Sequence, residues 1–471
     1  MLLNFLKLIK NIIKWIARLL ELFIILLFCF LIFCFFIIRV SPPKVNDFNC
    51  PNRIEISDNH YVIGSNWLKK NEFGIWEMYI EGEPYERGVI YGELAKELCQ
   101  QQEDIFVSQI NNFIPSPFLK EFLRFFIGFF NRNISDNIPL ENQQEIYGIS
   151  KSFTSEYDYI APKYMRILNY HSAHDIGHAL NDYSLVGCTS FSMNDSLSYN
   201  NNLIVARNFD FYIGDEFAND KLILFMNPNK GYSFTSYSWA GFTGVVSGVN
   251  EKGLSVTINA SMSEVPTSSK TPISILTRQI LQYASNIEEA IKIARNNEIF
   301  VSESIMVSSS YDDKTIIIEK SPDKMSVYDS ENNFIICTNH YQSNQFLKSE
   351  INMRNLSNTD SKYRFDKIHQ RLHEKNKYNL KDVVNILRDQ TGLNNDTLGM
   401  GNPKAVNQLL AHHSVVIQPK QLMFYISTND YQLGSFIGYN LSSVFSNQKV
   451  DTTLVIAPDN FLYSNDYKNY K

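Results

Sequence analysis

The chain has 471 residues, of which 44% are apolar and 20% charged, with a formal net charge of -6. This length is sufficient for a large buried core, and the composition excludes collagen-like, disordered and disulfide-stapled proteins. A net acidic chain has no global basic field, so nucleic acid is not expected as a partner.

The amino terminus combines basic and apolar residues. Residues 22–38 form an uncharged apolar run, which Leu19 and Leu20 extend to about the twenty residues that span a bilayer core. Basic residues precede this run, and an excess of basic charge on that side predicts a cytoplasmic amino terminus.

This pattern predicts a basic cytoplasmic segment over residues 1–18 and a transmembrane signal anchor over residues 19–40. The expectation is a single-pass membrane protein, with its catalytic domain on the extracytoplasmic or lumenal side. The alternative is a cleaved signal peptide, which the length of the run and the poor cleavage site at Val40-Ser41-Pro42-Pro43 disfavour.

An exported domain would fold in an oxidising space, where cysteines pair. Cys50 and Cys99 are therefore a candidate disulfide, with two unpaired thiols as the alternative.

Residues 41–77 are expected to form a linker and the start of the folded domain. Residues 78–187 are predicted to be mainly helical, because apolar residues recur at helical spacing over 85–114 and 161–180.

From Cys188 onward the pattern changes to short apolar runs bounded by turn residues, which is typical of strands. The strands are predicted at 203–206, 222–226, 244–249, 254–258, 304–307, 315–319, 325–328, 334–338, 414–417 and 422–426. Helices are predicted at 273–284, 287–295, 361–375 and 380–389. Many strands bracketed by helices predict two stacked sheets with helices outside.

The sequence Gly187-Cys188-Thr189-Ser190 holds a candidate nucleophile. A thiol nucleophile needs a base, either a histidine from elsewhere in the fold or its own α-amine after scission of the preceding peptide bond. Gly187 leaves that bond sterically open. Alone, a cysteine at the start of a strand is more often a core residue.

Polar side chains at the ends of other predicted segments add to this motif. They are Arg207 and Asp210, three residues apart, Asn259 in Thr257-Ile258-Asn259-Ala260, Asn339 in Cys337-Thr338-Asn339-His340, and Arg364. Each by itself is more typical of a turn, a cap or a salt bridge than of a catalytic site.

Together these motifs resemble the N-terminal-nucleophile (Ntn) hydrolases. They are most similar to the acyl-CoA:6-aminopenicillanic acid acyltransferase family of autoproteolytic acyltransferases and hydrolases, which is related to choloylglycine hydrolases and acid ceramidase-type amidases. The resemblance runs from Gly82-Glu83-Pro84-Tyr85-Glu86-Arg87-Gly88 through Gly187-Cys188 and Arg207-Asn208-Phe209-Asp210 to His413-Ser414-Val415-Val416.

The resemblance implies a catalytic role for each of these residues. Cys188 would be the nucleophile, freed by cleavage after Gly187, and Arg207 and Asp210 would position its thiol and new amine. Asn259 would donate to the oxyanion. Asn339 would bond the amine or the substrate amide, and Arg364 would support the site.

The implied fold is α+β, a four-layer αββα sandwich of two antiparallel sheets flanked by helices, here preceded by the transmembrane helix. Cleavage would leave a helical fragment ending at residue 187 in association with a catalytic fragment, residues 188–471.

The implied function is hydrolysis or transfer of the acyl group of a linear, non-peptide amide through a Cys188 thioester. The substrate would be a small or lipid-like amide, with no cofactor and no metal. A lipid-like substrate agrees with the predicted membrane tether.

Three alternatives stay open. The chain is an unprocessed, non-catalytic member that binds amphiphiles or a partner, or a thiol protease that pairs Cys188 with His340 or His413. A zinc site on the His171, His174, Asp175 and His178 face is disfavoured, since one ion cannot reach ligands spread over two helical turns.

Overall fold

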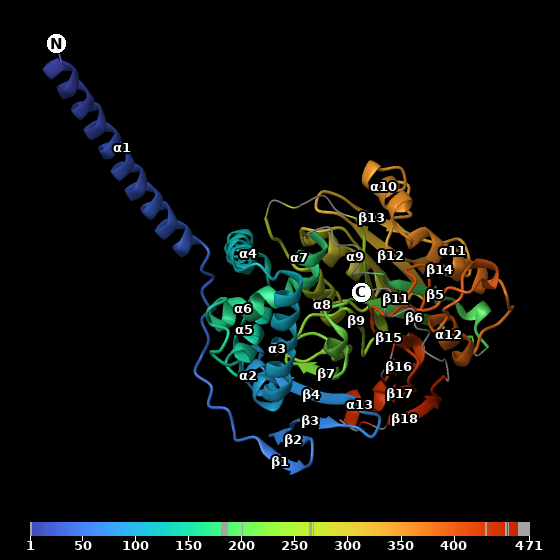
Figure 1. Cartoon of the computed structure of the whole chain (residues 1–471). Coiled ribbons are helices and arrows are strands. Elements are labelled where there is room, and N and C mark those ends of the chain that lie inside the picture. Colours follow the sequence, from blue (N-terminus) through green and yellow to red (C-terminus); the bar gives the residue numbers. More distant parts are fainter. Residues whose placement is uncertain are drawn as a thin grey trace.

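The computed structural model describes residues 2–179, 187–199, 201–262, 266, 268–428, 431–447, 450 and 452–459 (Figure 1). Within this part of the chain the strands form two sheets. The larger sheet has the order β1 (Ile54–Ser57), β2 (His60–Ile63), β3 (Asn66–Lys70), β4 (Trp76–Gly82), β7 (Lys221–Pro228), β8 (Phe234–Trp239), β9 (Ser247–Asn250), β10 (Leu254–Ala260), β11 (Glu303–Ser309), β12 (Lys314–Lys320) and β13 (Met325–Tyr328). The smaller sheet has the order β14 (Phe334–Cys337), β5 (Thr189–Met193), β6 (Ile204–Asp210), β15 (Ala411–Gln418), β16 (Met423–Ser427), β17 (Phe436–Asn440) and β18 (Thr452–Ile456).

Helices precede, separate and follow these strands. They are α1 (Leu2–Ile37), α2 (Pro84–Leu94), α3 (Lys96–Phe113), α4 (Pro117–Phe130), α5 (Leu140–Ser150), α6 (Lys163–His171), α7 (Ala173–Ala179), α8 (Ile273–Tyr283), α9 (Ile287–Asn296), α10 (Glu350–Asn358), α11 (Ser361–Arg371), α12 (Leu380–Leu387) and α13 (Leu441–Asn447). The mainly helical character predicted for residues 85–180 agrees with α2 to α7.

The two sheets stack face to face, and apolar side chains from both fill the space between them. The buried cluster there joins Phe225 and Met306 of the larger sheet to Val415 and Phe424 of the smaller one. A second cluster packs α8 and α9 on the outer face of the larger sheet, and a third packs α11 and α12 on the outer face of the smaller sheet. The order of layers is therefore helix, sheet, sheet, helix, as an Ntn-type sandwich requires (Figure 1).

One pairing departs from the antiparallel sheets that we predicted. β4 pairs with β7 in parallel, with Trp76 opposite Leu222 and Gly82 opposite Pro228. Parallel neighbours need a long crossover. Here it contains α2 to α7 and the first two strands of the smaller sheet, so the helical region and the sandwich are built into one unit.

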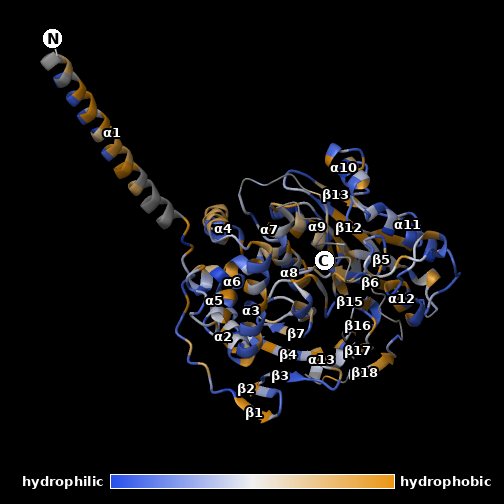
Figure 2. Cartoon of the chain, viewed as in Figure 1, coloured by the Kyte–Doolittle hydropathy of each residue, from blue (hydrophilic) through white to orange (hydrophobic). Residues whose placement is uncertain are grey.

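The predicted transmembrane anchor over residues 19–40 is wrong. The segment is helical within α1, but the described residues contain no helix with the length and apolar character needed to cross a membrane. The charged side chains of α1 lie in its first part, at Lys7, Lys10, Lys14, Arg18 and Glu21. Figure 2 shows hydrophilic and hydrophobic bands alternating in the part of α1 nearer the amino terminus. The single-pass topology that followed from this anchor is therefore not supported.

Candidate active site

Cys188 lies at the entrance to β5, a strand inside the smaller sheet, and its side chain is fully buried. The thiol donates to the backbone carbonyl of Asp210, with Sγ 3.6 Å from the oxygen. Burial raises the pKa of this thiol to about 11, while the positive charge of Arg207 acts in the opposite direction. The thiol is therefore protonated at neutral pH and needs a proton acceptor before it can attack a carbonyl.

Arg207 connects the two sheets at this point. It lies on β6 opposite Ser190 of β5, and its Nη2 is 3.8 Å from the sulfur of Cys188. The same guanidinium donates to the carbonyl oxygens of Val246 and Ile258 in the larger sheet, at 2.8 and 2.5 Å. Burial lowers its pKa, but an arginine stays charged in proteins, so a fixed positive charge lies beside the thiol.

Asp210 ends β6, and its carboxylate lies away from the guanidinium of Arg207. Burial raises the pKa of this carboxyl to about 7, although the positive charges of Arg364 and Arg207 lower it. Its Oδ2 accepts from Nε2 of Gln408 at 3.4 Å. Its Oδ1 has no hydrogen-bond partner among the described residues, so one lone-pair direction is free to receive an amine.

Asn259 approaches from the larger sheet, near the end of β10. Its Oδ1 accepts from the hydroxyl of Ser190, two residues beyond the nucleophile, at 2.7 Å. Its Nδ2 donates to the carbonyl of Cys337 at 3.1 Å. The Ser190 contact fixes which way the amide points, and Nδ2 carries a second hydrogen that this carbonyl does not use.

Asn339 and Arg364 form a connected pair at the rim of this group. Asn339 follows β14 and donates to the carbonyl of Ala260, at the end of β10, at 2.9 Å. Arg364 of α11 donates to the Oδ1 of Asn339 and to the carbonyl of Pro403, both at 2.7 Å. The charge of Arg364 also lowers the pKa of Asp210. The structure therefore brings the predicted residues Cys188, Arg207, Asp210, Asn259, Asn339 and Arg364 into one linked group.

The two histidines of the thiol-protease alternative are engaged elsewhere. His340 contacts the hydroxyl of Ser361 at 2.8 Å, and His413 contacts that of Ser247 at 3.1 Å. Burial lowers the pKa of both imidazoles, that of His340 to about 4. Within the part of the chain that the structure describes, the Cys188 thiol makes polar contacts with Arg207 and Asp210 and is not hydrogen-bonded to a histidine.

The histidine-rich face before the nucleophile is used for packing. His171 contacts the carbonyl of Ile167 and the hydroxyl of Thr243, and Asp175 accepts from the backbone N–H of Ile273. His174 lies 3.6 Å from the carboxylate of Glu303. The side chain of His178 is outside the described residues.

Cys50 and Cys99, the candidate disulfide pair, are both free thiols. Cys99 is buried on α3, whereas Cys50 lies in the irregular segment before β1 and is partly exposed. Their connection is therefore not formed in this structure.

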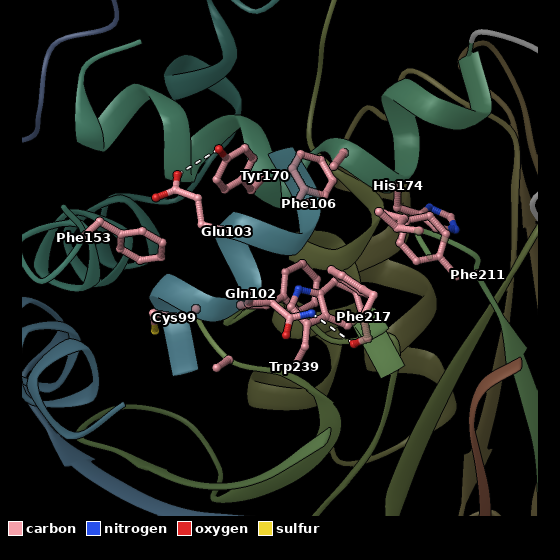
Figure 3. Close-up of a pocket in the computed structure, with 15 residues that line it drawn as sticks. Cys99, Gln102, Glu103, Phe106, Phe153, Tyr170, His174, Phe211, Phe217 and Trp239 are labelled. Atoms are coloured by element: carbon pink, nitrogen blue, oxygen red, sulfur yellow. Dashed lines mark hydrogen bonds between the residues drawn. The ribbon is translucent and has the colours of Figure 1, made fainter. Parts of the chain in front are cut away.

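An aromatic pocket begins beside the site, and Figure 3 shows its lining. It encloses about 530 Å³ of empty space, its solvent-facing part included. Phe211, the residue after Asp210, forms part of its wall together with Phe217 and Trp239, while Glu103 and Tyr170 supply polar groups. The hydroxyl of Tyr170 donates to Glu103 at 2.9 Å, so these groups are already paired.

Sequence reasoning missed two buried polar residues near the nucleophile. Gln408 contacts both Gly187 and Asp210, and Glu303 lies close enough to raise the pKa of Cys188. Gln408 carries no local signal, because it lies in an irregular segment more than two hundred residues away. Burial raises the pKa of the Glu303 carboxyl well above its ordinary value.

Comparison with known proteins agrees with the resemblance seen in the motifs. Residues 197–430 match the family described as acyl-coenzyme A:6-aminopenicillanic acid acyl-transferase. The matched range begins after Cys188 and contains Arg207, Asp210, Asn259, Asn339 and Arg364. The resemblance to this family is confirmed over that range.

Two curated proteins are similar over part of the chain. Protein dcd1B of Dictyostelium discoideum is 26% identical over 283 residues, covering 56% of this chain and 53% of that protein. An uncharacterized protein of Archaeoglobus fulgidus is 24% identical over 239 residues, covering 48% of this chain and 40% of that protein. The chain thus spans about half or less of the length of these relatives.

Solved structures of amide-cleaving enzymes align at low similarity. The Caenorhabditis elegans N-acylethanolamine-hydrolyzing acid amidase ortholog is 16% identical, with a TM-score of 0.37, and covers 57% of this chain and 100% of its own. The R18L variant of conjugated bile acid hydrolase from Clostridium perfringens is 12% identical, with a TM-score of 0.37 and coverage of 59% and 100%. Penicillin V acylase from Agrobacterium tumefaciens is 14% identical, with a TM-score of 0.36 and coverage of 59% and 100%.

Proposed function

From the family likeness of residues 197–430, we propose that this chain is a self-processing cysteine enzyme that cleaves or transfers the acyl group of a linear amide. Cleavage between Gly187 and Cys188 would divide it into a fragment ending at residue 187 and a catalytic fragment of residues 188–471. The two fragments would stay associated, because β4 of the first pairs along its whole length with β7 of the second.

The single observation that carries the proposal is the position of Cys188. Its thiol is buried between a fixed positive charge on Arg207 and the end of β6, directly after a glycine. A cysteine that only packs in the core does not require a buried arginine beside it, and burying a charge costs free energy. The same arginine lowers the pKa of the thiol and so favours the nucleophilic thiolate.

The α-amine that cleavage frees on Cys188 supplies the base that the site lacks. An α-amine has an ordinary pKa of about 7.7–8.0, so it accepts the thiol proton at neutral pH far more readily than a buried imidazole of low pKa. Asp210, with one carboxylate oxygen open, receives the protonated amine. The negative charge that develops on the substrate oxygen is then stabilised by the free N–H of Asn259.

The aromatic pocket beside Phe211 favours an apolar acyl group. Aromatic and apolar side chains predominate in its lining, and three of its polar side chains are already hydrogen-bonded, Tyr170 to Glu103 and Gln102 to the carbonyl of Phe217. Such a pocket retains a hydrocarbon chain by burying its surface. We therefore propose an N-acyl amide with an apolar acyl chain as substrate.

Intact-mass measurement under denaturing, reducing conditions tests the self-processing. Wild type should give two chains, one beginning at Cys188, whereas Cys188→Ala should stay whole. The purified wild type should then hydrolyse dodecanoyl 4-nitroanilide, and Cys188→Ala should not. If folded wild type stays whole and inactive, the chain is the unprocessed binding member of this fold, and the proposal is refuted.

A further inference from the structure

Gln408 lies against the peptide bond that the proposed function would cleave. Its Nε2 is 3.3 Å from the carbonyl oxygen of Gly187 and 3.4 Å from the Oδ2 of Asp210. An amide nitrogen carries two hydrogens, so one N–H is directed at the carbonyl and the other at the carboxylate. The side chain is 1% exposed, which keeps both contacts away from bulk water.

The segment that carries Gln408 is held in place on both sides. Asn208, on the same strand as Arg207, donates to the carbonyl of Val406 at 2.9 Å. The backbone N–H of Asn407 donates to Asp389, and that of Leu409 donates to Met400, at 2.9 and 3.1 Å. An oxyanion donor must be rigid before charge develops, and these bonds supply that rigidity.

Gly187 fits this arrangement because it has no side chain. A Cβ at this position would lie 2.8 Å from the Nε2 of Gln408, closer than such atoms approach in proteins. The glycine thus allows the amide to reach the carbonyl of the peptide bond that would be cut.

We propose that Gln408 stabilises the oxyanion of the self-cleavage reaction, a role that rests on the proposed function above. The Cys188 sulfur attacks the Gly187 carbonyl carbon, a C–S bond forms, and the carbonyl oxygen takes the negative charge that the Gln408 N–H stabilises. The C–N bond then breaks, and the thiol proton passes to the departing α-nitrogen of Cys188. Water hydrolyses the thioester, leaving the Gly187 carboxylate and the Cys188 thiol.

This assigns separate donors to the two reactions. In self-cleavage the carbonyl belongs to Gly187 and lies under Gln408, whereas in turnover it belongs to the substrate and is met by Asn259 from the other sheet. The oxyanion role of Gln408 is therefore confined to maturation, and its loss should slow self-cleavage far more than turnover by already cleaved enzyme.

The test uses the full chain, pulse-labelled in cell-free translation, with fragment release followed over time. Gln408→Leu removes the donor, and Gln408→Glu keeps the shape but places a carboxylate against the scissile carbonyl. Removing one oxyanion donor lowers rates by about 100–1,000-fold, so both variants should release fragments about 100-fold more slowly or worse. Asn407→Ala, which removes the neighbouring buried amide, should cleave at the wild-type rate.

Each outcome separates this inference from the proposed function. Wild-type cleavage rates in both Gln408 variants would overturn the inference and leave self-processing intact, while a folded wild type that never cleaves would overturn both. Gln408→Glu that has completed cleavage should lose far less of its hydrolysis of dodecanoyl 4-nitroanilide than of its cleavage rate, and an equal loss of turnover would contradict a role limited to maturation. The melting temperature of Cys188→Ala, measured with and without Gln408→Leu, shows whether Gln408→Leu disturbs the fold. If it does, the cleavage rate of Gln408→Glu tests the inference instead.

Discussion

Two fully buried clusters in this molecule combine arginine with a carboxylate, and they differ in how completely the carboxylate is paired. In the first, Glu145 of α5 accepts from Arg87 of α2 at 2.6 Å and from Arg278 of α8 at 3.2 Å. The two guanidinium groups hold the pKa of Glu145 below its usual value, despite the burial. This cluster is closed, and it ties the helical region to the sandwich.

In the second cluster, Arg207 donates to backbone carbonyls and to the Cys188 thiol, and Asp210 is left with one open oxygen. The pKa of Asp210 rises to about 7. The pKa values of the equally buried Glu145 and Asp210 therefore shift in opposite directions. The reason is that Glu145 accepts hydrogen bonds directly from guanidinium groups, whereas Asp210 does not. Perturbed, incompletely paired groups are typical of reactive sites, whereas closed pairs are typical of structure.

Breaking the closed cluster should have the largest effect on stability. Glu145→Gln leaves two buried guanidinium groups without their counter-charge, and we expect it to cost about 3–5 kcal/mol of unfolding free energy. Urea titration in a Cys188→Ala background measures this without interference from cleavage. Asp366→Asn, which breaks an exposed pair with Lys362, is the control and should cost about 1 kcal/mol or less. If Glu145→Gln also cost only about 1 kcal/mol of unfolding free energy, the first cluster would not have the structural role that distinguishes it from the second.

Changing the open cluster should instead affect turnover. Asn259→Ala removes the proposed oxyanion donor, and kcat should fall by about 100–1,000-fold, or 2.7–4 kcal/mol of transition-state stabilisation. Asn250→Ala is the matched control, since Asn250 is also a buried amide of the larger sheet but donates to the carbonyls of Leu281 and Ala284. The control should lose stability and keep its turnover per folded molecule. Full activity in Asn259→Ala would contradict the role.

A smaller effect is expected at the rim of the site. Arg364→Lys cannot bond both Asn339 and Pro403, so the Asn339 amide loses its orientation. A hydrogen bond to a charged group is worth about 1.5–3 kcal/mol, so kcat/KM should fall by about 10–100-fold. Arg388→Lys alters another buried arginine that bonds backbone carbonyls, at Gln432 and Gly434, and should leave kcat/KM unchanged.

The open cluster should also give stability a pH dependence. The pKa of Asp210 in the folded chain is about 7, above its ordinary value of 3.8. Its stabilising contribution to the free energy of unfolding is therefore fully present below about pH 4 and is lost as the pH rises through 7. Asp210→Asn should remove this slope, at most about 1.4 kcal/mol per pH unit, in unfolding measured from pH 4 to 8 in the Cys188→Ala background. The pH dependence that comes from Glu145 has the opposite sign. Its pKa is lowered in the folded chain, so its ionised form stabilises the fold at higher pH and this stabilisation is lost on acidification. An unchanged slope in Asp210→Asn would show that Asp210 is ionised throughout.

Local pattern was enough to predict most of the sandwich. The runs at 254–258, 315–319 and 414–417 lie within β10, β12 and β15, because short runs rich in apolar residues and bounded by turn residues are typical of buried strands. β1 to β5, β8, β17 and β18 were not predicted as strands, and β1 is exposed along its whole length. The anchor was predicted from the apolar run and the basic residues before it, but the described residues contain no helix long and apolar enough to cross a membrane.

By itself, the sequence determined the order of the motifs, from Gly187-Cys188 through Arg207 and Asp210 to Arg364, and the family likeness over residues 197–430. Only the tertiary structure decided which groups meet. It placed Gln408 over the Gly187 carbonyl, Ser190 against Asn259, and the guanidinium of Arg207 across the gap between the sheets. The physical reason is that local spacing specifies a strand and its faces, whereas contacts between residues separated by up to 221 positions depend on how the two sheets stack.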